Sequence, residues 1–393
     1  MANPINVVVL PGFAGTTLSY LGGAFGGRTN YWYTPTALAS TNPLAGALDA
    51  DGVSPYPVFG KKLLPGGPVD MGIYEPLLTN LANNGFNPVF WGYDWRMNPN
   101  TTAANFANFL KRANLANPFS IVAHSFGGLI AQVAYPLYKA LNATPVWNQS
   151  IYLGTPHGGS HWSAAALGGW FPHGSELALF VEVFKLKNVA LGTAIEKFYK
   201  GIQIALGILV GSWPGLYSLL PNDYGPWEAD DPNSDLLAEE TEYVNTPLGQ
   251  QQQWFHAAVL FQQQIVTGLS APRPLETCIV GSGIPTLTTY LGQEQPGTQG
   301  GYQTSLNGDG TVTTHRASLP NIGIIAQLDG VAHNQLVTGI DGNNLVVLYL
   351  QNPPSASSER NATPPSTLAT PPSALPPLLP PLLNPFANTH SDP

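Results

Sequence analysis

The stretch FSIVAHSFGGLIAQVAYPLY, residues 119–138, sets a single serine between a β-branched apolar run and a run of helix-forming residues. Phe119–Ala123 is typical of a strand buried on both faces, and the residues after the serine are typical of a helix. Ala123 and Gly127 stand two positions before and after Ser125, and their small size allows a strand and a helix to approach closely across a sharp turn. A serine at such a turn is held in a strained conformation with its hydroxyl exposed above the sheet. We therefore predict that Ser125 is a nucleophile.

The motif differs from the common pattern G-x-S-x-G, because Ala123 occupies the first small position. Alanine still meets the steric requirement. The alternative interpretation is a serine that caps a helix after a glycine-rich turn. In either case the helix that begins after Ser125 brings backbone N–H groups and the positive end of its dipole to this place.

Other segments extend this unit into an alternating pattern of strands and helices. The predicted strands are Ile5–Leu10, Pro88–Gly92, Phe119–Ala123, Gln149–Leu153, Glu276–Gly281 and Ile322–Leu328, and the predicted helices are Thr101–Asn114 and Phe126–Lys139. Strands that alternate with helices form parallel sheets. We predict an α/β protein with a mostly parallel central sheet.

The chain divides into four predicted parts. Residues 1–159 form the first part of the core, with Ser125, and residues 274–351 form its second part. Residues 160–273 interrupt the alternation and are predicted to be an insertion, with an amphipathic helix near Glu176–Tyr199. Residues 352–393 are a Pro-rich tail that cannot form a regular helix or a strand ladder.

Composition excludes some functions and leaves others open. The formal net charge is -9 and the chain has 14 lysines and arginines, which argues against nucleic acid as a partner. Cys278 is the only cysteine, so no intramolecular disulfide can form. No set of His, Cys, Asp or Glu has the spacing of a metal site, and no cofactor is expected. No segment has the length and hydropathy of a membrane-spanning helix. The localisation stays open: a cytoplasmic protein, or a secreted one whose signal peptide has been removed.

A serine hydroxyl needs a base to take its proton and a carboxylate to orient that base. In this architecture the partners follow in the order serine, acid, histidine, each after a later strand. Asp309, in SLNGDGTV, and His333, in DGVAHNQLV, occur in that order. We predict that Asp309 is the acid and His333 the base. Asp309 is alternatively a turn residue, and Asp329 is the competing acid.

Three other histidines compete with His333. His315 follows Asp309 too soon to lie in a separate loop, and His256 belongs to the helical segment QQQWFHAAVLFQQQ. His157 is expected in a structured loop. His333 is thus favoured by its position.

The loop after the first strand, in VVVLPGFAGTTL, is the candidate for the second half of an oxyanion hole. We predict that the backbone N–H groups of Phe13 and Phe126 stabilise a developing oxyanion. A phosphate-binding loop is the alternative, but the motif G-x-x-x-x-G-K-[ST] is absent.

Seven short blocks resemble the lecithin:cholesterol acyltransferase-like family of α/β-hydrolases, which includes phospholipid:diacylglycerol acyltransferases and lysosomal phospholipases. The blocks are VVVLPGFAGTTL, WGYDWR, AHSFGG, YLGTPHGGS, WPGLYSLLPND, NGDGTV and the segment around His333, in the order of the family. The resemblance implies an α/β-hydrolase fold, a cap and lid over residues 160–273, and a triad of Ser125, Asp309 and His333. This chain differs from the vertebrate members of the family, whose lid contains disulfides that a chain with one cysteine cannot form.

These observations predict a serine esterase or lipase that hydrolyses a lipid-like carboxylic ester through an acyl-enzyme. An acyltransferase, which passes the acyl group to an alcohol, would use the same residues. A lipid-binding protein without enzymatic activity is the alternative from another class, and a peptidase would share the triad. The expected partner is the ester substrate, with transient contact to a lipid interface through the insertion, whose apolar helix face could equally pack against the core.

Overall fold

The computed structural model describes most of the first 353 residues of the 393-residue chain. The described residues are 4–21, 27–32, 43–49, 51–57, 60–69, 72–113, 115, 118–142, 144–167, 209–221, 251–269, 273–290, 302–319 and 326–353. The predicted helix at Glu176–Tyr199, most of the predicted insertion and nearly all of the Pro-rich tail lie outside them. The division into four parts therefore stays a prediction.

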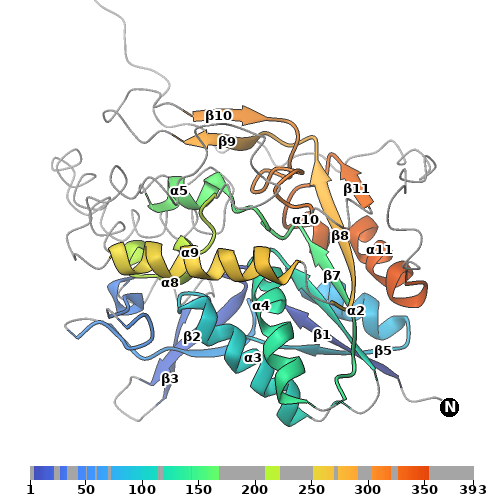
Figure 1. Ribbon diagram of the computed structural model, residues 1–393, viewed down its shortest axis with the longest axis horizontal. Coiled ribbons are helices and arrows are strands. Elements are labelled where there is room, and N and C mark those ends of the chain that lie inside the picture. The colour runs from blue at the N-terminus through green and yellow to red at the C-terminus, as the bar shows by residue number, and fades with distance from the viewer. Residues whose placement is uncertain are drawn as a thin grey trace, which may run out of the picture. The chain divides into compact units, whose positions relative to one another are not determined.

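A six-stranded parallel sheet lies at the centre of the described chain, in the order β11-β8-β7-β6-β1-β5 (Figure 1). Its strands are β1 (Ile5–Leu10), β5 (Phe86–Phe90), β6 (Phe119–His124), β7 (Trp147–Leu153), β8 (Leu275–Ser282) and β11 (Ala326–Asp329). All six predicted strands are confirmed: Ile5–Leu10 has the predicted bounds, and the other five have shifted ends. The chain has the α/β-hydrolase fold, as expected.

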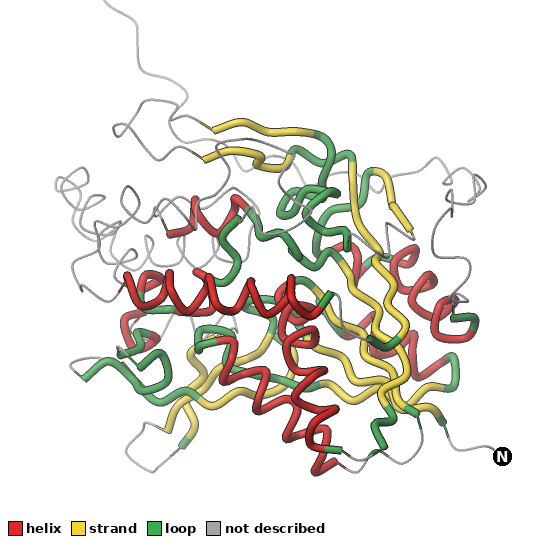
Figure 2. Tube along the Cα trace, viewed as in Figure 1, coloured by secondary structure: helices red, strands yellow, loops and turns green. Residues whose placement is uncertain are grey.

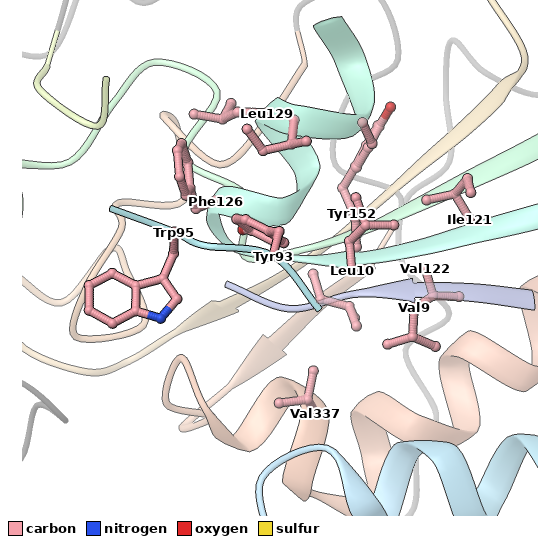
Figure 3. Packing of buried hydrophobic residues seen from close by; sticks show 14 of the residues in the cluster. Val9, Leu10, Tyr93, Trp95, Ile121, Val122, Phe126, Leu129, Tyr152 and Val337 are labelled. Atoms are coloured by element: carbon pink, nitrogen blue, oxygen red, sulfur yellow. The ribbon is translucent and has the colours of Figure 1, made fainter. Parts of the chain in front are cut away.

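Helices cover both faces of this sheet (Figure 2). One group consists of α3 (Pro99–Ala113), α4 (Phe126–Leu141) and α9 (Gln251–Gly268), which pack against one another. The other group consists of α2 (Glu75–Asn83), α10 (Gln335–Thr338) and α11 (Ile340–Gln351). Figure 3 shows β1 between α4, which carries Phe126 and Leu129, and Val337 of α10 on the opposite side.

The hydrophobic pattern of β1 explains why it lies inside the sheet. Val7, Val8 and Val9 have no exposed surface, although alternate residues of a strand point to opposite faces. Both faces of β1 are therefore covered. A continuous run of β-branched residues, without alternation, is the pattern that such a doubly covered parallel strand requires.

Two small antiparallel sheets accompany the central one. The first has the order β3-β2-β4, with β2 (Thr16–Leu21), β3 (Arg28–Trp32) and β4 (Leu64–Pro68), and the second pairs β9 (Thr286–Tyr290) with β10 (Tyr302–Ser305). The remaining short helices are η1 (Pro43–Gly46), α5 (His161–Leu167) and α8 (Pro214–Tyr217). None of the described helices is both long and apolar enough to cross a membrane.

Candidate active site

Ser125 lies at the junction of β6 and α4, at the carboxyl end of the central strands. Its backbone angles, φ 53° and ψ -128°, fall in a region that is strained for a residue with a side chain. The turn is tight, because a Cβ atom on Gly127 would lie 2.5 Å from the carbonyl oxygen of Pro11. Only glycine fits at position 127, which explains the small residue two positions after Ser125. The predicted strand–turn–helix geometry is confirmed.

The loop after β1 reaches Ser125 directly. A Cβ atom on Gly12 would lie 2.8 Å from the Cβ atom of Ser125 and 3.3 Å from its Oγ atom. Ala14, two residues further, has φ 64°. Among the described residues, Ala14 and Ser125 are the only ones other than glycine with positive φ. Backbone strain is thus concentrated in the two loops that meet at the serine.

The amides predicted to form an oxyanion hole lie in these same two loops. Within the described part of the chain, neither the N–H of Phe13 nor that of Phe126 donates a hydrogen bond to a protein acceptor. Their rings lie close together, with centroids 6.1 Å apart. Among the described residues, both amides are therefore left without a protein acceptor.

Asp309 and His333 lie together in the structure. Nδ1 of His333 lies 2.7 Å from Oδ2 of Asp309, and the backbone N–H of His333 donates to the carbonyl oxygen of Asp309 at 2.8 Å. The other carboxylate oxygen, Oδ1, accepts the backbone N–H groups of Thr311 and Val312 at 3.0 and 2.8 Å. The carboxylate is thus fixed from both sides, and Asp309 is only 1% exposed.

The competing acid has a different partner. Oδ1 of Asp329 accepts a hydrogen bond from the hydroxyl of Ser282 at 3.2 Å. Asp329 also lies at the end of β11, where its side chain is exposed. The geometry favours Asp309 over Asp329 as the partner of His333.

Contacts of neighbouring residues bring the histidine close to the serine. The ring of His124, the residue before Ser125, lies 4.7 Å from the ring of His333, centroid to centroid. Gly154 follows β7, and a Cβ atom there would lie 3.0 Å from both Oδ2 of Asp309 and Cε1 of His333. The backbone N–H of Ser125 donates to the carbonyl oxygen of Leu153 at 2.8 Å. The segments after β6, β7, β10 and β11 therefore converge on one place.

Of the rival histidines, His157 has other partners than Ser125, and the side chain of His256 lies outside the described residues. His157 is fully buried, and its Nδ1 lies 3.0 Å from Oε1 of Gln132. Burial, and to a lesser degree the charge of Arg273, lowers the pKa of His157 well below its usual value. His157 is a neutral core residue. The side chain of His256, on α9, is outside the described residues.

The segment WGYDWR contributes a buried ion pair and an aromatic wall. Nε of Arg96 donates to Oδ1 of Asp94 at 2.9 Å, and Arg96 is 1% exposed. Trp95, which lies between Asp94 and Arg96 in sequence, packs against Phe13 with ring centroids 4.7 Å apart. Trp162 and Trp213 lie 6.4 and 6.2 Å from the same ring. The surroundings of Phe13 are thus apolar.

Two residues of the site were missed by the sequence analysis. The hydroxyl of Tyr74 accepts the backbone N–H of Gly12 at 2.8 Å and lies 2.9 Å from Nδ1 of His124. The Nε2 atom of His124 lies 3.2 Å from the carbonyl oxygen of His333. Tyr74 is far from the other residues in sequence and belongs to no motif. Only the position of His124 beside Ser125 could have suggested a role.

Similarity to known proteins is found at the level of structure. No protein-family model matches the chain, and no curated protein matches it in sequence. The crystal structure of the Tle4–Tli4 complex is similar, with a TM-score of 0.56 and 13% identity over 89% of this chain and 98% of the other. This likeness supports the assignment of the α/β-hydrolase fold.

Two other solved structures match with lower scores. The mature lipase BlEst2 of Bacillus licheniformis has a TM-score of 0.35 and 12% identity, covering 89% of this chain and 92% of the other. RedJ, a thioesterase of prodiginine biosynthesis in Streptomyces coelicolor, has a TM-score of 0.33 and 12% identity, covering 89% and 90%.

Proposed function

We propose that the chain is a serine esterase or lipase that hydrolyses a lipid-like carboxylic ester through an acyl-enzyme. Ser125 is the nucleophile, His333 the general base and then acid, and Asp309 the carboxylate that orients the imidazole. The N–H groups of Phe13 and Phe126 stabilise the oxyanion. An acyltransferase with the same first half-reaction is the second candidate.

One observation carries the proposal: a strained serine and a hydrogen-bonded Asp309–His333 pair lie at the same edge of a parallel sheet. Strained backbone at a residue other than glycine persists only where surrounding structure imposes it, and such residues cluster at active sites. The 2.7 Å contact between His333 and Asp309 fixes the imidazole with its proton on Nδ1. Nε2 is then free to accept the proton of a serine hydroxyl.

The proposed reaction follows from these positions. As Oγ of Ser125 attacks the ester carbonyl, its proton passes to Nε2 of His333, and the carbonyl oxygen becomes an oxyanion. The alcohol leaves with that proton, and an acyl-Ser125 ester remains. Water then attacks this ester with His333 as base, which releases the acid and restores the serine hydroxyl. In this proposal the N–H groups of Phe13 and Phe126 donate to the oxyanion in both steps.

The apolar surroundings support a substrate with a hydrocarbon part. Phe13 carries one of the proposed oxyanion amides, and its ring packs among Trp95, Trp162 and Trp213. The resemblance to the lecithin:cholesterol acyltransferase-like family points to the same class of acyl donor. The proposal includes a cap and lid formed by residues 160–273, which would contact a lipid surface.

Product analysis of purified protein and its Ser125→Ala variant tests the function. Each is given a phospholipid with a labelled acyl chain, with and without an excess of a long-chain alcohol. We expect free fatty acid from the wild type alone. A new ester in the presence of the alcohol would establish the acyltransferase instead. Equal product from both proteins, or none from either protein on phospholipids and on simple soluble esters, would refute the proposal.

Covalent labelling tests the nucleophile separately. A fluorophosphonate phosphonylates an activated serine hydroxyl, with fluoride as the leaving group. Mass spectrometry of the digested wild type should place a single adduct on Ser125, and the Ser125→Ala variant should carry none. An adduct on another serine would move the role to that residue.

A further inference from the structure

We infer that Tyr74 and His124 form a positioning bridge that fixes the oxyanion loop relative to the general base. The bridge runs from the N–H of Gly12 to the hydroxyl of Tyr74, to the imidazole of His124, and on to the carbonyl oxygen of His333. It joins the loop after β1, the last residue of β6 and the loop after β11. This inference rests on the proposed function, and neither residue takes part in the chemistry itself.

The protonation of His124 follows from its partners. The carbonyl oxygen of His333 can only accept a hydrogen bond, so Nε2 of His124 carries a proton and donates across 3.2 Å. Burial, reinforced by the charge of His333, lowers the pKa of His124 well below its usual value. The ring is therefore neutral, and Nδ1 has no proton. Nδ1 accepts the hydroxyl proton of Tyr74 across 2.9 Å.

The hydroxyl of Tyr74 is thus used in both directions. It donates to His124 and accepts from the N–H of Gly12 at 2.8 Å. Gly12 directly precedes Phe13, whose own N–H is one of the two proposed oxyanion donors. The hydroxyl therefore fixes the peptide next to that donor. Tyr74 and His124 are 2% and 3% exposed, so water cannot readily replace either contact.

Packing around the bridge leaves little room for movement. A Cβ atom on Gly15 would lie 2.7 Å from the hydroxyl oxygen of Tyr74, which shows how closely the oxyanion loop encloses it. The ring of Tyr74 lies 5.7 Å from that of Phe90 and 5.8 Å from that of His124. The bridge is accordingly a rigid spacer. Displacement of a catalytic group by about 1 Å can reduce a rate by about 10²-fold, so such a spacer affects turnover.

The Tyr74→Phe variant tests this inference, because it keeps the ring and removes only the hydroxyl. We expect kcat on a soluble short-chain ester, normalised to active sites titrated with a fluorophosphonate, to fall by about 10- to 100-fold, while KM stays within twofold. A trifluoromethyl ketone, which forms an oxyanion on the enzyme, should bind more weakly by a similar factor. A merely structural role would lower the number of titrated sites and leave both normalised quantities unchanged.

Tyr138→Phe is the matched control. Tyr138 is 3% exposed, and its hydroxyl likewise accepts a backbone N–H, from Val146 at 3.3 Å, but at the far end of α4 from Ser125. This control should retain the normalised kcat of the wild type. If Tyr74→Phe does not fold, His124→Phe, which keeps an aromatic ring and removes both imidazole contacts, should give the same loss in kcat and ketone affinity.

The outcomes separate this inference from the proposed function. Normal kcat and ketone affinity in Tyr74→Phe, with an active wild type and an inactive Ser125→Ala variant, would overturn the bridge alone. Equal losses in Tyr74→Phe and Tyr138→Phe would overturn it as well. An inactive wild type would overturn the proposed function and the bridge with it.

Discussion

The environment of Asp309 predicts the effect of replacing it by asparagine. Oδ1 of Asp309 accepts two backbone N–H groups, those of Thr311 and Val312, and Oδ2 faces Nδ1 of His333. In Asp309→Asn the amide oxygen must keep the position of Oδ1, because the amide nitrogen cannot accept these two N–H groups. The NH2 group then points at His333.

This forced orientation places the proton on the wrong nitrogen of the imidazole. Nδ1 of His333 must accept from the new NH2 group, so the ring proton moves to Nε2, which can no longer accept the proton of Ser125. A wrong tautomer of this kind lowers kcat by about 10⁴-fold. At about 1.4 kcal/mol for each factor of ten, this equals about 5.5 kcal/mol in activation free energy. The fold should be unaffected, since the substitution is nearly isosteric.

Kinetics on a soluble ester, with Asp329→Asn as the control, measure the effect. Asp329 contacts Ser282 rather than His333, so its variant should stay within a few-fold of the wild type. The reasoning would be refuted if Asp309→Asn retained more than about a tenth of kcat. Loss in Asp329→Asn alone would transfer the acid to that residue.

Three further predictions concern stability and reactivity. The pKa values of His124 and His157 are lowered in the folded state, so below about pH 6.5 the unfolded chain binds more protons than the folded chain. The free energy of unfolding should therefore fall by about 1.4 kcal/mol per histidine between pH 7.5 and pH 5.5. In urea titrations of His157→Gln this fall should be smaller by about 1.4 kcal/mol than in the wild type, and an unchanged pH dependence would contradict the prediction. Burial raises the pKa of the Cys278 thiol to about 12, so a thiol reagent at pH 8 should react about 10³-fold more slowly with folded than with urea-unfolded protein, and equal rates would disprove its burial. Gly128→Ala should destabilise the fold by about 1–3 kcal/mol, because the new Cβ would lie 2.0 Å from Oγ1 of Thr155; adding Thr155→Ala should restore part of that loss, and independent effects would argue against the contact.

The central sheet could be predicted well, because a strand that is buried on both faces has a continuous apolar sequence. Ile5–Leu10 is apolar without interruption, and the observed strand has the same bounds. β4 was missed, because its sequence LPGGP contains two prolines and two glycines, which are poor strand formers. Pairing with β2 overrides this preference, and such pairing is a tertiary effect that no local pattern records.

The candidate site divides in the same way. Ser125 is marked by the small residues that its turn requires, and Asp309 and His333 by their order after later strands. Their roles remain predictions, although the 2.7 Å contact between them agrees with the assignment. Tyr74 could not be predicted, since it meets His124 only after folding brings residues 50 positions apart together.

The strained backbone of Ser125 also bears on how far this protein can be stabilised. A residue other than glycine at φ 53° raises the free energy of the folded state by about 1–3 kcal/mol, which exceeds the entropy of about 0.5–1 kcal/mol that a glycine would lose on folding. Replacing the proposed nucleophile by glycine should therefore give a more stable protein with no activity. Selection or screening for thermal tolerance alone would favour that change, so a search for hardier variants of this chain must score turnover together with melting temperature.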